Sequence, residues 1–137
     1  SNIRRKDTSL MEIGSSPSLM PELSLLENIK YFLFNDNINE NMISNVLNKY
    51  ELESFKSDLV RDFSSGMVKR SEIAIADLKN PKVLCIDEPR VYLDENGVDL
   101  LLNLITKREK EGSTSILSSQ ESIGAFTSIE RSFNLND

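Results

Sequence analysis

The sequence lacks histidine and tryptophan altogether, and its 137 residues include only one cysteine and five glycines. Without histidine, an imidazole general base, a Ser-His-Asp triad and a histidine-ligated metal are all excluded. Cys85 has no partner for an intrachain disulfide, which favours a reducing compartment. No apolar stretch approaches the roughly 20 residues needed to cross a bilayer. We therefore expect no direct membrane insertion and assign any membrane association to a partner.

Positive charge is also scarce. Sixteen Lys and Arg stand against 22 Asp and Glu, which gives a net charge of −6, and no long basic run offers a footprint for nucleic acid or anionic lipid. We therefore expect no nucleic-acid binding. The hydrophobic fraction of 39% and the charged fraction of 28% are ordinary for a folded domain, so the chain is expected to have a packed core.

The first half of the chain predicts two helices after a polar lead-in. Residues 1–18 are polar and mixed, with a loop signal at residues 14–17 and no helix assigned. Ser24 and Glu27 have the spacing of a capping box, and a second helix is predicted from about Asn39. The apolar positions that recur on one face are Leu26, Ile29, Phe32 and Leu33 in the first helix and Ile43, Val46, Leu47 and Tyr50 in the second.

The second half predicts helices that alternate with strands. A Ser-Ser-Gly loop at residues 64–66 opens a helix to about Leu78, and residues 82–86 read as a strand covered on both faces. A helix at about 95–110, a strand at 113–117, a short helix at 121–126 and a possible strand at 132–135 follow. This alternation predicts an α/β domain with a parallel sheet. The residues expected to face inward from helix 95–110 are Val98, Leu101, Leu102 and Ile105.

Two adjacent carboxylates, Asp87 and Glu88, end the apolar strand. Open parallel sheets bind ligands at their carboxyl edge. In phosphoryl transfer, the first carboxylate of such a pair would hold Mg²⁺ and the second would orient or deprotonate the attacking water. The alternative is that the pair only caps the following turn or helix.

A loop of small residues, Phe63-Ser64-Ser65-Gly66-Met67, lies at the start of a predicted helix. Free backbone N–H groups at a helix N-terminus suit an anion such as a phosphate. The alternative is an ordinary serine cap without a ligand.

Together, the two elements resemble the ABC ATPases, in which an L-S-G-G-Q signature lies one helix upstream of a Walker B strand ending D-E-P. Ser64 and Gly66 match the signature, while its other three positions differ. Leu93-Asp94 resembles the D-loop, and residues 21–28 resemble the P-E-L-T-x-x-E-N stretch after the Q-loop. The resemblance runs from about residue 13 to 134. It implies a partial P-loop NTPase-type ABC ATPase fold: a helical subdomain and the C-terminal part of the parallel-sheet core.

The resemblance also implies the roles of the site residues. The family's switch histidine aligns with Gln120, which can donate an amide hydrogen bond but cannot carry positive charge, so we expect slow hydrolysis rather than none. Asp87 would hold Mg²⁺ and Glu88 would act as the general base. The residues implied to contact ATP or its surroundings are Ser64, Ser65, Gly66 and Met67 of the signature, Asp94 of the D-loop and Ser15 at the Q-loop position.

The resemblance divides the chain into residues 1–23 as the Q-loop region and lead-in, residues 24–66 as the helical subdomain, and residues 67–137 as the Walker B, D-loop and switch-loop part of the core. The phosphate-binding G-x-x-x-x-G-K-[ST] loop is absent from the 137 residues, and the fold would place it upstream. We therefore expect this part to act on a neighbouring subunit's nucleotide and to be inactive in isolation.

Within the family, residues 13–15 and 19–24 resemble the I-G-H-x-x-x-L-x-P-E-L-T run of the ATP-binding subunits of haem exporters for cytochrome c maturation. Residues 63–67 and 118–120 are similar to their signature and switch loops. The resemblance implies a pair of ATP-binding subunits on the cytoplasmic face of the inner (plasma) membrane or an organellar membrane. There the pair would drive an integral permease that exports haem.

Three interpretations remain open. The chain could belong to a hydrolysing transporter subunit, to a non-hydrolysing ABC-like module that holds or regulates a complex, or to an unrelated α/β interaction domain. Three aromatic residues, Tyr31, Phe32 and Phe34, could form a coupling surface for the permease. We expect at least two of them to lie in the core instead.

Overall fold

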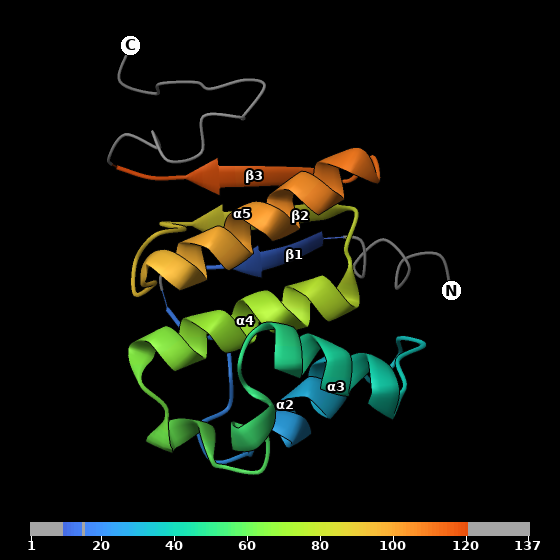
Figure 1. The fold of residues 1–137 in the computed structure, drawn as a ribbon, viewed down its shortest axis with the longest axis vertical. Helices are drawn as coiled ribbons and strands as arrows, with labels where there is room; N and C mark the ends of the chain where they lie inside the picture. Colours follow the sequence, from blue (N-terminus) through green and yellow to red (C-terminus); the bar gives the residue numbers. More distant parts are fainter. Residues whose placement is uncertain (1–9, 15, 121–137) are drawn as a thin grey trace.

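The computed structural model describes residues 10–14 and 16–120. Three strands in this part form a parallel sheet with the order β1-β2-β3 (Figure 1). The chain runs through β1 (Leu10–Ile13), α2 (Leu25–Phe32), α3 (Glu40–Lys49), the short 3₁₀ helices η1 (Glu53–Phe55) and η2 (Val60–Asp62), α4 (Ser65–Lys79), β2 (Val83–Asp87), α5 (Glu95–Lys110) and β3 (Thr114–Ser118).

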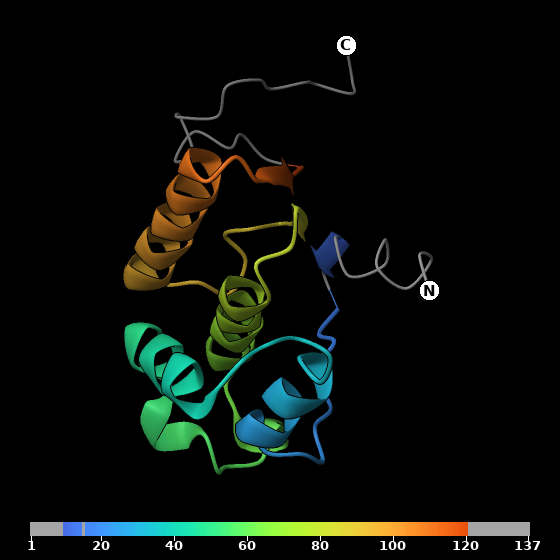
Figure 2. The ribbon, with the colours of Figure 1, turned by 90° about the vertical axis from the view of Figure 1, so that its right-hand side faces the viewer.

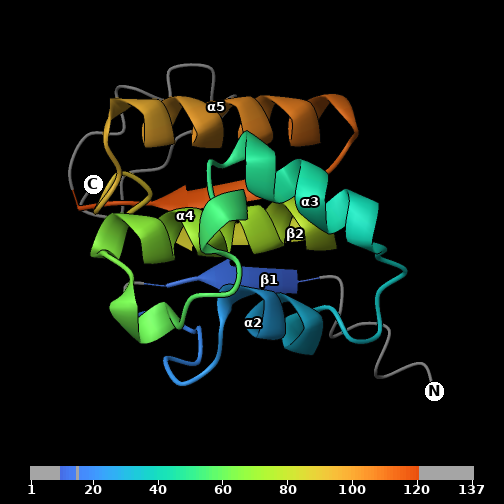
Figure 3. The same ribbon diagram turned by 60° about the horizontal axis from the view of Figure 1, so that its bottom comes forward.

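The predicted parallel α/β arrangement is confirmed. Ile13 pairs with Ile86, and Asp87 pairs with Ser118, so the carboxyl ends of all three strands meet at one edge. Figures 1 and 3 show that α4 and α5 both begin on the side of the molecule where this edge lies. The loop after β2 and the first turns of two helices are thereby brought to one end of the molecule.

β1 is a strand where the sequence predicted none. Its four residues are too few to establish an alternating pattern, and only Ile13 among them is buried. The strand forms because β2 offers a complete row of hydrogen-bonding partners from Val83 to Ile86. Residues 10–13 of the polar lead-in are thus part of the sheet.

The sheet is covered differently from the prediction for residues 82–86. Figure 2 shows α4 and α5 on the same side of the sheet. Leu84 and Ile86 are buried, whereas Val83 and Cys85 are only partly buried. Successive side chains of a strand point to opposite faces. The described helices therefore bury the side chains on one face of β2, while those on the other face are only partly buried. The expectation of a strand covered on both faces is therefore met on only one face by the described residues.

The starts of α2 and α3 and the end of α4 lie at the residues that the sequence indicated. Ser24 and Glu27 form the capping box of α2, with both reciprocal hydrogen bonds present. Asn39 caps α3, and its side chain accepts from the N–H of Met42. Asn80 ends α4 in the left-handed conformation with φ of 48°. Local side-chain chemistry therefore sets these boundaries.

The helical subregion, residues 24–64, packs α2 and α3 against α4 beneath the sheet (Figures 1 and 2). Tyr31 and Phe34 are 64% and 80% exposed, and only Phe32 of the three aromatics is partly buried. The expectation that at least two would lie in the core is wrong, because α2 buries the face that carries Leu25 and Ile29.

In α5, the most buried apolar residues are Leu101 and Leu104, while Val98, Leu102 and Ile105 are partly buried. Leu104 was not among the residues expected to face inward. No helix in residues 10–14 and 16–120 is long and apolar enough to cross a membrane. Ser15 and the elements predicted at 121–126 and 132–135 lie outside the described residues.

Candidate functional site

Glu88 follows β2 directly and is held at both its backbone and its carboxylate. Its N–H donates to the Ser118 carbonyl at 2.7 Å, and its own carbonyl accepts from Lys69 Nζ at 3.1 Å. Ser119 Oγ donates to one carboxylate oxygen at 3.0 Å, and the Gln120 N–H donates to the other at 2.9 Å. The structure therefore brings the predicted general base and the predicted switch position together.

Asp87 lies at the exposed end of β2, and the Ser118 hydroxyl donates to its Oδ1 at 2.9 Å. Mg²⁺ in phosphate sites is usually bound through one or two carboxylates together with phosphate oxygens and waters. A single exposed carboxylate suits that mode of binding. Among the described residues, no group of three or more His, Cys, Asp or Glu side chains could hold a metal ion.

A groove of about 830 Å³ lies beside Glu88. It is bounded by the loop after β2, the start of α5 and the end of β3, so its walls come from the carboxyl edge of the sheet. Three predicted site residues, Glu88, Asp94 and Gln120, line it. The other lining residues are Arg90, Val91, Leu93, Glu95, Val98, Asp99, Leu102 and Ser119.

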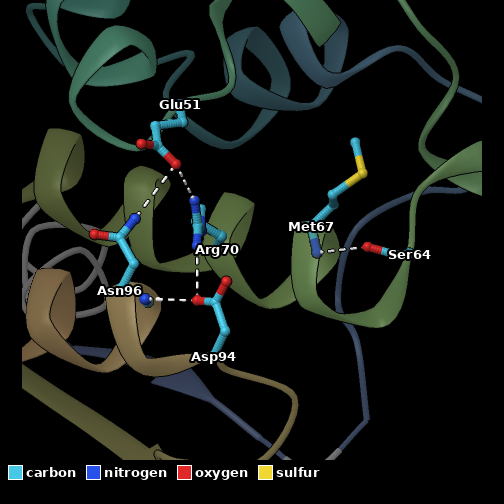
Figure 4. Close-up of polar contacts among 7 residues, drawn as sticks. Glu51, Ser64, Met67, Arg70, Asp94 and Asn96 are labelled. Atoms are coloured by element: carbon cyan, nitrogen blue, oxygen red, sulfur yellow. Dashed lines mark hydrogen bonds and ion pairs between the residues drawn. The ribbon is translucent and has the colours of Figure 1, made fainter.

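The signature-like loop forms the N-terminus of α4. Ser64 caps the helix, and its hydroxyl accepts from the N–H of Met67 at 3.1 Å (Figure 4). A Cβ added to Gly66 would lie 2.9 Å from the Tyr92 carbonyl oxygen, which is closer than real Cβ contacts. A glycine at position 66 therefore lets this loop contact the backbone of the segment just before Leu93-Asp94.

Arg70 joins this loop region to Asp94 and to the helical subregion. Its side chain is 14% exposed, and its guanidinium pairs with Asp94 Oδ1 at 3.0 Å and with Glu51 Oε2 at 2.8 Å. Asn96 Nδ2 also donates to Glu51 at 3.3 Å (Figure 4). Asp94 in turn caps α5 by accepting from the Gly97 N–H at 2.7 Å. This N–H holds the pKa of the exposed Asp94 carboxyl below its usual value, and Arg70 adds to the effect.

The predicted site residues thus fall into two groups. Asp87, Glu88 and Gln120 meet at the end of the sheet, and the loop of residues 64–67 lies beside the segment that carries Asp94. Ser15 is outside the described residues.

Sequence reasoning missed Lys69, Arg70 and Ser119. The Lys69 and Arg70 contacts join residues 19 to 24 positions apart, and no local pattern specifies such contacts. Ser119 could have been found from the sequence, because it belongs to residues 118–120, which resemble the switch loop of the family.

Comparison with known proteins decides the family. A family model described as "ABC transporter" matches residues 2–91. The chain belongs to the ABC transporter family. It is 36% identical over 113 residues to the lantibiotic transport ATP-binding protein SrtF of Streptococcus pyogenes, a match that covers 80% of this chain and 49% of SrtF.

A second relative carries the name of the predicted subfamily. The chain is 28% identical over 117 residues to the cytochrome c biogenesis ATP-binding export protein CcmA of Histophilus somni, and the match covers 84% of this chain and 54% of CcmA. CcmA is one of several distant relatives with different named substrates. The comparisons therefore support the family but not the haem-export subfamily.

A solved structure described as the ATP binding subunit of an ABC transporter has the same fold. It superposes with a TM-score of 0.77 at 25% identity, over 86% of this chain and 50% of that one. The predicted fold class, a partial ABC ATPase of the α/β type, is therefore confirmed. The chain spans about half the length of the curated relatives it matches.

Proposed function

We propose that the chain is part of the ATP-hydrolysing subunit of an ABC transporter. The observation that carries the proposal is the position of Glu88, which lines the groove and whose carboxylate is oriented by Ser119 and the Gln120 N–H. In this role Glu88 accepts the proton of the attacking water. Asp87 holds Mg²⁺, which would neutralise charge on the phosphates. Gln120 takes the switch position, and we expect slow turnover because its amide carries no positive charge.

The N-terminal end of α4 is proposed to act on a nucleotide held by a second subunit. The chain has no G-x-x-x-x-G-K-[ST] loop to grip a triphosphate itself. The first N–H groups of α4, around Ser65 and Gly66, suit a phosphate that arrives from outside. Ser64 and Met67 form the cap at that end of the helix, and Asp94 pairs with Arg70 further along it. A pair of ATP-binding subunits, a homodimer in the simplest case, would place this end over its partner's ATP.

The helical subregion is proposed to receive a membrane permease. Tyr31 and Phe34, both exposed, line with Lys30 and Phe32 a surface pocket of about 540 Å³. An exposed aromatic pocket of this kind suits an apolar segment of a partner. The subunit would then work at the cytoplasmic face of the inner (plasma) membrane or of an organellar membrane, without inserting into it.

Haem export for cytochrome c maturation is the substrate hypothesis that the resemblance of residues 13–15 and 19–24 supports. The higher identity to SrtF, whose name specifies lantibiotic transport, supports lantibiotic transport as the second candidate. The two differ in a measurable way. Deletion of the gene would abolish holocytochrome c formation in the first case, and would abolish resistance to or release of a lantibiotic in the second.

The activity itself is tested with the full-length subunit that contains this chain, purified with its permease. Glu88→Gln is expected to lower the ATPase kcat by a factor of about 100 or more while ATP binding is retained, because a general base is lost without loss of shape. Glu109→Gln, an exposed change on α5, is the matched control. Equal, measurable rates for the wild type and Glu88→Gln would contradict the role of Glu88 as general base, and absence of turnover in both would support the non-hydrolysing module instead.

A further inference from the structure

A lysine and a glutamate one helical turn apart, Lys69 and Glu72, are buried in α4. They are 5% and 4% exposed, respectively. Lysine and glutamate are rarely buried to this degree without a specific partner, because the desolvation of a charge is costly. The buried surface of α4 therefore carries two ionisable side chains where apolar side chains would pack more easily.

Lys69 forms a hydrogen bond with the residue that follows β2. Its Nζ donates to the Glu88 carbonyl oxygen at 3.1 Å. Burial lowers the pKa of Lys69, but the carboxylates of Glu72, Asp87 and Glu88 favour its charged form. Burial raises the pKa of Glu72, and a hydrogen bond from the Ser18 hydroxyl at 3.2 Å opposes that effect. The charges of Glu72 and of the two carboxylates of the site therefore both favour an ammonium at Lys69.

The carbonyl that Lys69 holds belongs to a strained residue. Glu88 has φ of 50°, a left-handed conformation that non-glycine residues adopt only where the surroundings enforce it. The peptide groups on both sides of Glu88 are fixed. Its N–H is bound to Ser118, and its carbonyl accepts from Lys69 and from the Val91 N–H at 3.2 Å. Release of the carbonyl would let the backbone relax and turn the carboxylate away from Ser119 and Gln120.

We propose that Lys69 is a positioning residue for Glu88, in that its buried ammonium fixes the backbone conformation from which the catalytic carboxylate reaches the groove. The inference deepens the proposed function and depends on it for its catalytic consequence. Lys69 itself touches neither ATP nor water in this role. Glu72, tethered by Ser18 of the segment after β1, supports the charge of Lys69.

The test compares Lys69→Met with Lys79→Met in the full-length subunit. Methionine keeps the length and apolar stem of lysine but removes the donor and the charge. Lys79 lies on the same helix, is also largely buried and pairs with Asp36 at 3.3 Å, far along α4 from Glu88. We expect Lys69→Met to lower the ATPase kcat about tenfold with a KM for ATP within about twofold of the wild type, because orientation is lost and binding is not.

A second measurement does not require turnover. Amide hydrogen exchange at Gln120, whose N–H donates to the Glu88 carboxylate, is expected to accelerate about tenfold in Lys69→Met relative to the amides of α2. Lys79→Met should leave this ratio unchanged. If the wild-type subunit fails to hydrolyse ATP, the proposed function is wrong, and the exchange ratio alone then decides whether Lys69 positions Glu88.

If Lys69→Met proves unfolded by circular dichroism, Lys69→Gln takes its place. Glutamine is smaller and polar but uncharged and shorter in reach, so a fall in kcat in the same direction is expected. A folded Lys69 variant with wild-type kcat and wild-type Gln120 exchange overturns the proposal. Equal effects of Lys69→Met and Lys79→Met also overturn it, because they would reflect general loosening of α4.

Discussion

Asp77 is a buried carboxylate in α4 on which three side chains converge. Lys49 Nζ lies 2.7 Å from Oδ2, Lys107 Nζ lies 3.0 Å from Oδ1, and the Tyr50 hydroxyl donates to Oδ2 at 3.0 Å. Burial raises the pKa of Asp77, but the hydrogen bonds from Lys49 and Lys107 outweigh burial and hold the pKa below its usual 3.8. Burial, followed by the nearby Asp77 charge, raises the pKa of Tyr50. Asp77 thus ties α3 and α5 to α4.

We expect Asp77→Asn to lower the free energy of unfolding by about 1–2 kcal/mol at neutral pH, since both lysines are partly exposed and their contribution is screened. The folded-state pKa of Asp77 is depressed, so its stabilisation is present above pH 3.8 and is lost as the pH falls through the folded value. The difference in the free energy of unfolding between the wild type and the variant should therefore become smaller below about pH 4. Urea unfolding at a series of pH values measures it.

Glu40→Gln serves as the control for this titration. Its carboxylate pairs with Lys30 at 3.3 Å, but the two side chains are 76% and 55% exposed. We expect Glu40→Gln to change the free energy of unfolding by less than about 0.5 kcal/mol at any pH. A stability gap for Asp77→Asn that stays constant down to about pH 3 would contradict the assignment of the effect to the ionised carboxylate.

At this residue scale, sequence could identify the chemistry but not the contacts. Asp87 and Glu88 were predicted because an apolar strand that ends in two carboxylates is readable without a structure. The partners of Glu88 were not all predictable. Lys69 reaches it across 19 residues and looks like a solvent-exposed helical lysine in sequence, and only the packing of α4 buries it.

Among the elements, the crossover from α5 to β3 depends on one buried arginine. Arg108 is 1% exposed, and burial lowers its pKa. Its guanidinium donates to the carbonyls of Pro81 and Thr114 at 2.8 and 2.9 Å and to the Ser115 hydroxyl at 3.0 Å. It thereby joins the end of α5 to the starts of β2 and β3.

We expect Arg108→Met to destabilise the fold by about 2–4 kcal/mol, because methionine fills much of the space but removes the hydrogen bonds to two carbonyls and a hydroxyl. Lys110→Met, an exposed change in the same turn of α5, should cost less than about 0.5 kcal/mol. Thermal unfolding of the two variants measures the difference. Similar melting temperatures for both would show that water replaces the guanidinium at little cost.

Element boundaries were largely predictable because they depend on local chemistry. Ser24, Asn39 and Ser64 each cap a helix through their own side chains, and such signals lie within four residues of sequence. β1 was missed because its strand character comes from β2, a partner about 70 positions away. The exposure of Tyr31 and Phe34 was missed for a similar reason, since aromatic side chains are usually buried and only the packing of α2 decides otherwise.

At the scale of the whole molecule, Arg70 is a polar link between the helical subregion and the sheet core, in addition to Asp77. It contacts Glu51 at the end of α3 and Asp94 at the start of α5 while lying on α4, the helix that begins with the signature-like loop. A change in the orientation of the helical subregion would break one of its two ion pairs. Arg70 therefore couples the position of the residue 64–67 loop to that of Asp94.

We expect Arg70→Met to impair ATP hydrolysis at the partner's site rather than at the subunit's own. In mixed pairs of full-length subunits, one subunit carries Glu88→Gln to silence its site, and Arg70→Met is placed in the same or the opposite subunit. The signature end of the silenced subunit faces the active nucleotide, so Arg70→Met in the silenced subunit should lower turnover about tenfold. In the active subunit it should lower turnover by less than about twofold.

Lys56→Met, which removes a partly exposed pair with Glu53, is the control. Equal losses in both arrangements would mean that Arg70 only stabilises its own subunit.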